Sequence, residues 1–180
     1  MAHEILSFLL DVAAGLLAGA CLLRLYMQQQ RVPFGNPIGR FVFAVTDWLI
    51  LPLRRVLPAM GRIDTASLVA AYLIQLAQYT VLWALFSRGS YAAVPLVALF
   101  GLLQLTISAL TVLVIVYAIL SWVRSDSPIT DVIDRLCAPL LRPFRRAIPL
   151  VGGIDLSPLV LLVLLQVVSM VLRAVAGSVL

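Results

Sequence analysis

Four apolar stretches, each long enough to cross a lipid bilayer, leave this chain few folds to choose from. They cover residues 5–26, 66–86, 94–123 and 157–179, and a helix needs roughly 20 apolar residues to cross the hydrocarbon region. The chain has too little polar surface to cover a soluble globule, because 63% of its residues are hydrophobic and only 12% are charged, at a mean hydropathy of +1.09. We therefore predict an all-α, polytopic membrane protein with four transmembrane helices.

The first stretch does not look like a signal peptide, and the third is longer than a single crossing. The first begins "MAHEILSFLLD", which has acidic residues but no Lys or Arg, the reverse of the basic leader of a signal peptide. We expect it to remain as a transmembrane helix rather than to be cleaved. The third stretch is longer than one crossing requires, so its helix should tilt or project beyond the bilayer.

The distribution of charge predicts the orientation. All thirteen basic residues are arginine, and eleven of them lie in the two long connections or at the helix ends beside them. These eleven are Arg24, Arg31, Arg40, Arg54, Arg55, Arg62, Arg124, Arg135, Arg142, Arg145 and Arg146. Only Arg88 and Arg173 lie on the other side. Because basic residues concentrate on the cytoplasmic side of membrane proteins, the long connections are predicted to be cytoplasmic and both termini to lie outside.

An internal repeat divides the chain into two halves. Residues 36–69 align with residues 127–160 without a gap, with twelve identities in thirty-four positions, where chance would give roughly two or three. We assign residues 1–90 to the first repeat and 91–180 to the second, within one membrane domain. Each half crosses the membrane an even number of times, so the repeats are predicted to be parallel, related by an axis along the membrane normal.

Each long connection contains a predicted surface helix. In the second, "SPITDVIDRLCAPLLRPF" offers Ser127 as a helix cap, followed by Pro128 at the first helical position. Apolar residues follow at helical spacing, with charged residues on the other face, which predicts an amphipathic helix in the headgroup plane. The counterpart "IGRFVFAVTDWLILPL" is more hydrophobic, so it either dips deeper or packs on a partner. Whether these helices lie flat or re-enter the membrane is left open.

The same order of Pro, Arg, Gly and Asp follows each predicted surface helix, in "PLRRVLPAMGRID" and "PFRRAIPLVGGID". The prolines are expected to stop the surface helix, the glycine to permit a tight turn, and the aspartate to cap the next span. In the second copy Ser157 competes for the cap, which leaves Asp155 freer to pair with an arginine. The structural residues of the motif are Pro52, Pro58, Gly61, Asp64, Pro143, Pro149, Gly152 and Asp155.

The arginine pairs are the candidate binding residues. Arg54, Arg55, Arg145 and Arg146 occupy the same places in both copies, and guanidinium groups bind phosphate or carboxylate by paired hydrogen bonds. Their candidate ligands are anionic lipid headgroups or an acidic partner protein. The alternative is that they serve only to set the topology.

Polar residues inside the spans are the second set of candidates. Asp11 lies about two turns into the first span, where a charge is costly and suggests ion or proton handling, unless the span begins later. Gln75 and Gln166 are equivalent in the two repeats, which suits a symmetric hydrogen-bonded pair between helices. Gly15 and Gly19 form a face of small residues that favours close helix packing, within the chain or with a second copy.

Catalysis has little support in the sequence. His3 is the only histidine and Glu4 the only glutamate, and Cys21 and Cys137 lie in apolar and amphipathic runs without a CxxC motif. We therefore expect neither an enzyme nor a cofactor or metal site, and no nucleic-acid partner.

The doubled motif, together with "ILSW" at 119–122, resembles the YggT family of small bacterial membrane proteins, which has relatives in chloroplasts. The resemblance covers nearly the whole chain, although Tyr117 stands where the family pattern leads us to expect arginine. It implies a place in the bacterial inner membrane and links to osmotic-shock tolerance and potassium uptake in bacteria, and to cytochrome assembly and nucleoid organisation in plastids.

Two functional hypotheses follow. The first is a membrane scaffold, assembly factor or osmotic-stress factor that holds anionic lipid or a partner on an arginine-rich cytoplasmic face. The second is a potassium transport protein or an accessory subunit of a transporter, with a homo-oligomer needed to form a pore, because four helices with few internal charges make a poor pore in a single chain.

Overall fold

The computed structural model describes residues 2–57, 63–86, 90–123, 127–148 and 155–179. Every regular element in these ranges is a helix. In chain order the elements are α1 (Ala2–Gln29), α2 (Pro37–Val56), α3 (Thr65–Phe86), the short 3-10 helix η1 (Tyr91–Ala93), α4 (Val94–Val123), α5 (Pro128–Ala147) and α6 (Ser157–Val179).

Four of these helices are long and apolar enough to cross a membrane. The segments that qualify are His3–Gln29, Thr65–Phe86, Tyr91–Ser121 and Ser157–Val179, which correspond to α1, α3, α4 and α6. The prediction of an all-α chain with four such helices is therefore confirmed, and this is the make-up of a multi-pass membrane protein. At 30 residues, α4 is about 45 Å long and exceeds the roughly 30 Å of the hydrocarbon region.

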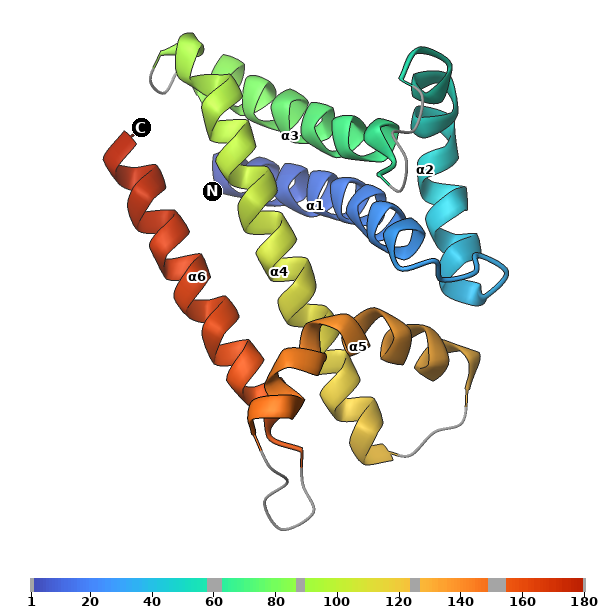
Figure 1. Ribbon diagram of the computed structural model, residues 1–180. Helices are drawn as coiled ribbons and strands as arrows, with labels where there is room; N and C mark the ends of the chain where they lie inside the picture. Colours follow the sequence, from blue (N-terminus) through green and yellow to red (C-terminus); the bar gives the residue numbers. More distant parts are fainter. Residues whose placement is uncertain (1, 58–62, 87–89, 124–126, 149–154, 180) are drawn as a thin grey trace.

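The spans pack side by side in the order α1, α3, α4, α6. α3 contacts both α1 and α4, α4 contacts both α3 and α6, and α4 also contacts α1 (Figure 1). The two termini and the end of α3 lie toward one side of the bundle, whereas α2 and α5 lie toward the other (Figure 1). The two long connections of the chain therefore share one side.

α2 and α5 are built alike. Both have 20 residues, with proline at the start. The side chain of Asn36 accepts a hydrogen bond from the Gly39 N–H at 2.9 Å, and the Ser127 hydroxyl accepts one from the Thr130 N–H at 3.2 Å. Each cap pairs with a backbone N–H that would otherwise be unsatisfied in the first turn. The ends of the two helices are 91 residues apart in the chain, which is the spacing of the sequence repeat.

α2 and α5 pack on the flanks of the spans rather than beyond their ends. Ile50 of α2 is fully buried in a cluster with Ala18 of α1 and Ala66 and Ala70 of α3. Leu141, its counterpart in α5, is buried against α4 and α6. The small alanine side chains at the α1–α3 contact let the two backbones approach closely.

Gly15 and Gly19 were expected to form a close-packing face, either within the chain or with a second copy, and the structure bears only on the first alternative. A Cβ atom added at either glycine would meet no other atom within 4 Å, so this face of α1 makes no close contact with any other helix that the structure describes. The close contact is made instead by Ala14 and Ala18, which are buried on a neighbouring face of the helix. A stretch rich in Gly and Ala offers several small faces, and tertiary packing selects one of them.

The expectation that proline stops the surface helices was wrong for two of the prolines. Pro52 and Pro143 lie inside α2 and α5, which continue through the arginine pairs and end at Val56 and Ala147. A proline removes one backbone hydrogen bond and crowds the preceding turn, but a helix can continue after it. The arginines therefore occupy the last helical turn, where positive charge favours the negative end of the helix dipole.

Candidate functional site

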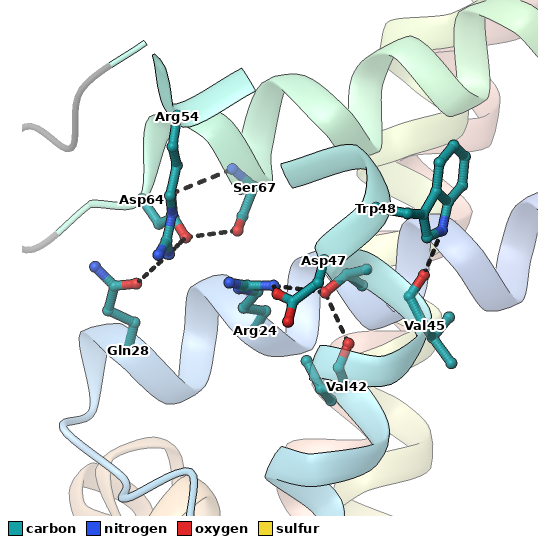
Figure 2. A network of polar contacts seen from close by, with 10 residues as sticks. Arg24, Gln28, Val42, Val45, Asp47, Trp48, Arg54, Asp64 and Ser67 are labelled. Carbon is teal, nitrogen blue, oxygen red and sulfur yellow. Dashed lines mark hydrogen bonds and ion pairs between the residues drawn. The ribbon is translucent and has the colours of Figure 1, made fainter. Parts of the chain in front are cut away.

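The first candidate site is the junction of α2 with α3, which we call elbow 1: Arg54, Arg55, Asp64 and Ser67. Arg54 Nη2 donates hydrogen bonds to the carboxylate of Asp64 and, at 3.2 Å, to Gln28 Oε1 at the end of α1 (Figure 2). Asp64 is completely buried. Its Oδ2 accepts a hydrogen bond from the Ser67 hydroxyl at 2.7 Å, and its Oδ1 accepts a longer one from the Ser67 N–H at 3.4 Å. One carboxylate thus caps α3 and anchors α2.

The charge on Asp64 is maintained by its partners. Burial by itself raises the pKa of the carboxyl, but the hydrogen bonds from Arg54 and Ser67 outweigh burial, so that the pKa lies below its ordinary value of 3.8. A buried charge requires such compensation, because desolvation without a partner is costly. Elbow 1 is therefore a closed ion pair at neutral pH rather than an open binding site.

The second candidate site, elbow 2, is the corresponding junction of α5 with α6: Arg145, Arg146, Asp155 and Ser157. Arg145 Nε donates to Asp155 Oδ2 at 2.8 Å, and the Ser157 N–H donates to Asp155 Oδ1 at 2.9 Å. A second guanidinium nitrogen of Arg145 donates to the hydroxyl of Tyr117. Elbow 2 is more open than elbow 1, because the side chains of Arg145 and Asp155 are 43% and 29% exposed.

Electrostatics stabilise the pair in elbow 2 as well. Burial raises the pKa of Asp155, but hydrogen bonds from Ser157 and Arg145 outweigh this effect and lower the pKa. Burial lowers the pKa of Arg145, but its hydrogen bond with Asp155 and its contact with Tyr117 outweigh burial and raise the pKa above its ordinary value. Both groups are therefore charged throughout the physiological range. Tyr117, which departs from the expected arginine, serves here as a partner for Arg145.

The other predicted site residues are divided between exposed and undescribed positions. Arg55 and Arg146, the second member of each pair, are exposed, and no ion pair of either is found among the described residues. Pro58, Gly61, Pro149 and Gly152 lie outside the residues that the structure describes. In each pair the first arginine is bonded to an aspartate and the second is exposed, but Arg145 is itself 43% exposed.

Sequence reasoning gave Arg24 a role in topology only, and missed its contacts. Its side chain is 3% exposed, and its Nη1 donates to Thr46 Oγ1 at 2.8 Å and to Asp47 Oδ1 at 2.6 Å (Figure 2). The guanidinium carbon lies 4.6 Å from the ring centroid of Phe43. The signal was present in the sequence, because an arginine inside an apolar stretch requires a partner. Arg24 fastens α2 to α1.

Polar residues inside the spans form hydrogen bonds that link one helix to another. Asp11 Oδ1 accepts a hydrogen bond from Gln78 Nε2 at 2.5 Å, which links α1 with α3. Gln104 Nε2 donates to the hydroxyl of Ser169 at 2.7 Å, which links α4 with α6. The symmetric pair of Gln75 and Gln166 does not form, because Gln75 is buried and Gln166 is exposed on the surface of α6. Packing therefore treats equivalent positions of the repeats differently.

A comparison with known families bears on this arrangement. The CCB3/YggT family model matches residues 3–85 and again residues 96–176. The chain belongs to the CCB3/YggT family. The second match begins 93 residues after the first and ends 91 residues after it, so the family pattern occurs twice. The resemblance to the YggT family inferred from the sequence is confirmed.

Several bacterial proteins are similar to this chain over most of their length. The chain is 44% identical over 169 residues to the protein YggT of Escherichia coli (strain K12), covering 92% of this chain and 87% of that protein. It is 36% identical over 178 residues to a protein of Vibrio alginolyticus named for its place in the proC 3′ region, with 97% and 96% covered. It is 35% identical over 168 residues to protein PA0392 of Pseudomonas aeruginosa, with 91% and 85% covered. No solved structure gives a significant match.

The spacing of the two family matches relates the polar contacts to each other. A shift of 93 residues, the offset between the starts of the two matches, takes Asp11 to Gln104, and a shift of 91 residues, the offset between their ends, takes Gln78 to Ser169. Among the residues that the structure describes, each half therefore has a hydrogen bond between its two spans at a corresponding place. The shift of 93 residues also takes Arg24 to Tyr117. The side chain of Arg24 contacts α2, and that of Tyr117 contacts α5.

Proposed function

We propose that this CCB3/YggT protein is a membrane scaffold whose arginine-rich cytoplasmic face holds anionic lipid headgroups, in a role that supports assembly of membrane components or resistance to osmotic stress. Its proposed place is the inner membrane of a bacterium, with both termini in the periplasm. The excess of arginine in the two long connections supports this orientation. The equivalent contacts in each half support a pair of parallel repeats, each with a cytoplasmic surface helix.

The observation that carries the proposal is the exposed face of α5. Arg135, Arg142 and Arg146 are exposed on this helix, beside the partly exposed Arg145 of elbow 2. The opposite face buries Val132, Ile133, Leu136, Cys137 and Leu141. A helix with this division of residues, attached to membrane spans at its apolar face, is suited to the headgroup region. Each arginine near an anionic surface contributes on the order of 1 kcal/mol to binding.

The elbows refine the assignment of binding residues. Arg54 and Arg145 are engaged by Asp64 and Asp155, so we assign headgroup binding to the exposed arginines and an organising role to the engaged pair. Asp131 and Asp134 are also exposed on α5, but both precede the arginine-rich last turns. The C-terminal half of α5 is therefore the proposed contact with phosphate groups.

Lipid titration tests this proposal. The purified protein would be titrated with phosphatidylglycerol and with zwitterionic phosphatidylcholine, and bound lipid counted by native mass spectrometry. Replacing Arg142 and Arg146 with glutamine should weaken phosphatidylglycerol binding roughly thirtyfold, from about 2 kcal/mol of lost attraction, with little effect on phosphatidylcholine. Arg173→Gln on the opposite side is the matched control. Equal binding of the two lipids by the wild type would contradict the proposal.

A second candidate function is ion transport, or support of a transporter. The observation that favours it is a cavity of about 640 Å³ at the side of the bundle that holds the termini, lined by His3, Glu4, Ser7 and Asp11 together with Leu85 and Phe86. Asp11 connects this cavity to the hydrogen bond with Gln78 inside the spans. Potassium flux into proteoliposomes tests this function: Asp11→Asn should reduce flux if the cavity conducts, and an absence of flux in the wild type would exclude it.

A further inference from the structure

α6 lies at the edge of the bundle, where it packs along α4 and against α5 (Figure 1). One face of α6 is buried in these contacts, through Leu161, Leu165 and Ser169. Another face carries Val163 and Met170, which are 57% and 60% exposed. Exposed apolar side chains are ordinary on a lipid-facing helix, so this face is informative only through its polar member, Gln166.

Gln166 differs from the other glutamines in the middle of a span. Gln75 and Gln78 are buried within the bundle, and Gln104 is bonded to Ser169. Gln166 is exposed, and its amide has no hydrogen bond with any residue that the structure describes. It lies nine residues after the start of α6 and thirteen before the end, at the depth where no water is available. An amide facing the hydrocarbon without a partner is unfavourable.

The surroundings of Gln166 suit a helix contact. Leu159, Val163, Gln166 and Met170 follow one another at intervals of four, three and four residues. This is the spacing of a seam between two helices that cross at a small angle. We call these four residues the α6 seam.

We propose that the α6 seam is the contact between two copies of this protein in the membrane, with Gln166 of each copy hydrogen-bonded to Gln166 of the other. Every copy inserts with the same orientation, so a closed dimer has its two-fold axis along the membrane normal. A residue near this axis meets its own counterpart at the same depth. An amide both donates and accepts, so glutamine complements itself in this geometry.

Arg173 marks the end of the seam. It follows Met170 by three residues on the same side of α6, but it lines a cavity of about 190 Å³ together with Tyr79 and Gln104. Its long side chain can therefore reach toward its own bundle and the outer membrane surface instead of the second copy. The dimer contact runs from Leu159 to Met170, and the helices diverge beyond it.

Disulfide crosslinking in native membranes tests the seam. Val163→Cys and Met170→Cys, introduced separately, should give disulfide-linked dimers under mild oxidation. Leu164→Cys and Val171→Cys are controls next to them in the sequence, at 48% and 57% exposure, but on another face of α6. Both native cysteines are buried, so the wild type should give no crosslink. Equal crosslinking at seam and control positions, or none at the seam, would overturn the proposal.

Replacement of Gln166 tests the hydrogen bond itself. In liposomes, dimer formation measured by single-molecule photobleaching should weaken roughly tenfold in Gln166→Leu and be largely retained in Gln166→Asn. Gln166→Leu improves the match with lipid, so misfolding would not account for a monomer. An unchanged dimer in Gln166→Leu, or crosslinks from the seam to a different protein, would show that a second copy is not the partner.

Discussion

Arg54, in the last turn of α2, donates a hydrogen bond to the carboxylate of Asp64, which is 0% exposed and caps α3. The equivalent pair, Arg145 and Asp155, joins α5 to α6 at the same separation of ten residues. α2 and α5 are therefore each fastened to the helix that follows by one ion pair, whose aspartate is buried in the first half and partly exposed in the second. The neighbouring Arg55 and Arg146 are left on the surface. The two ion pairs differ in their exposure to solvent.

Loss of Asp64 should destabilise the protein more than loss of Asp155. Asp64→Ala leaves Arg54 without its partner and removes a cap from α3. Because Arg54 is 36% exposed, we expect a loss of about 2 kcal/mol in the free energy of unfolding, below the roughly 3–5 kcal/mol typical of a fully buried pair. Asp155→Ala should cost less than about 1 kcal/mol, since its pair is open to solvent. Thermal unfolding in detergent measures both, and an equal effect of the two would contradict the burial argument.

Acid should weaken the elbows. The pKa values of Asp64 and Asp155 are lower in the folded protein than their ordinary values, so the folded state holds their protons less tightly than the unfolded state. Their stabilisation is present above the unfolded pKa of about 3.9 and is lost as the pH falls through the folded values. We expect constant stability from about pH 8 to pH 5 and a decline below about pH 4. In the variant with Asn at both positions the decline should be shallower; an identical acid profile would assign it to other groups.

Arg24 should control the attachment of α2 to α1. Arg24→Ala removes the hydrogen bonds to Thr46 and Asp47 and the contact with Phe43. We expect faster amide hydrogen exchange across α2 and little change in α5, because α5 is held by Tyr26 and by its own elbow. The matched control is Arg142→Ala, an exposed arginine that makes no such contacts with the residues that the structure describes. Uniform acceleration in both surface helices would indicate general destabilisation instead.

The two thiols should be inert in the folded protein. Cys21 and Cys137 are 1% and 0% exposed. Burial raises the pKa of Cys137 to about 12, so almost no reactive thiolate exists at neutral pH. A maleimide at about pH 7.5 should add to neither cysteine until the protein is denatured, when mass spectrometry should find both modified. Rapid labelling of the native protein would show that the packing of α5 on α4 opens readily.

The orientation is testable with reporter fusions at the C-terminus. Alkaline phosphatase needs disulfides, which form outside the bacterial cytoplasm, so its fusion at Leu180 should be active. A fluorescent reporter that folds only in the cytoplasm should remain dark at the same position. The reverse result would place α2 and α5 outside and would remove the basis for headgroup binding on the cytoplasmic side.

The sequence by itself determined the four long apolar helices and their order. Apolar length, caps such as Ser127, and the 91-residue repeat are local or linear features, and a bilayer imposes one length scale on every span. The sequence also predicted that Asp155 caps the next helix or pairs with an arginine, because its partners lie close to it in the chain. The sequence did not predict that α2 and α5 continue through Pro52 and Pro143, where helix packing outweighed the local preference of proline to end a helix.

Tertiary structure alone decided which side chains meet. Arg24 lies 23 residues from Asp47, and Asp11 lies 67 residues from Gln78, so these contacts depend on how whole helices are rotated against each other. The same rotation buries Gln75 and exposes Gln166, although the two are equivalent in the repeat. In a chain that is apolar on nearly every face, periodicity cannot indicate which face of a span turns inward. The packing of helix against helix makes that choice, and with it decides which polar groups are left for lipid or for a partner.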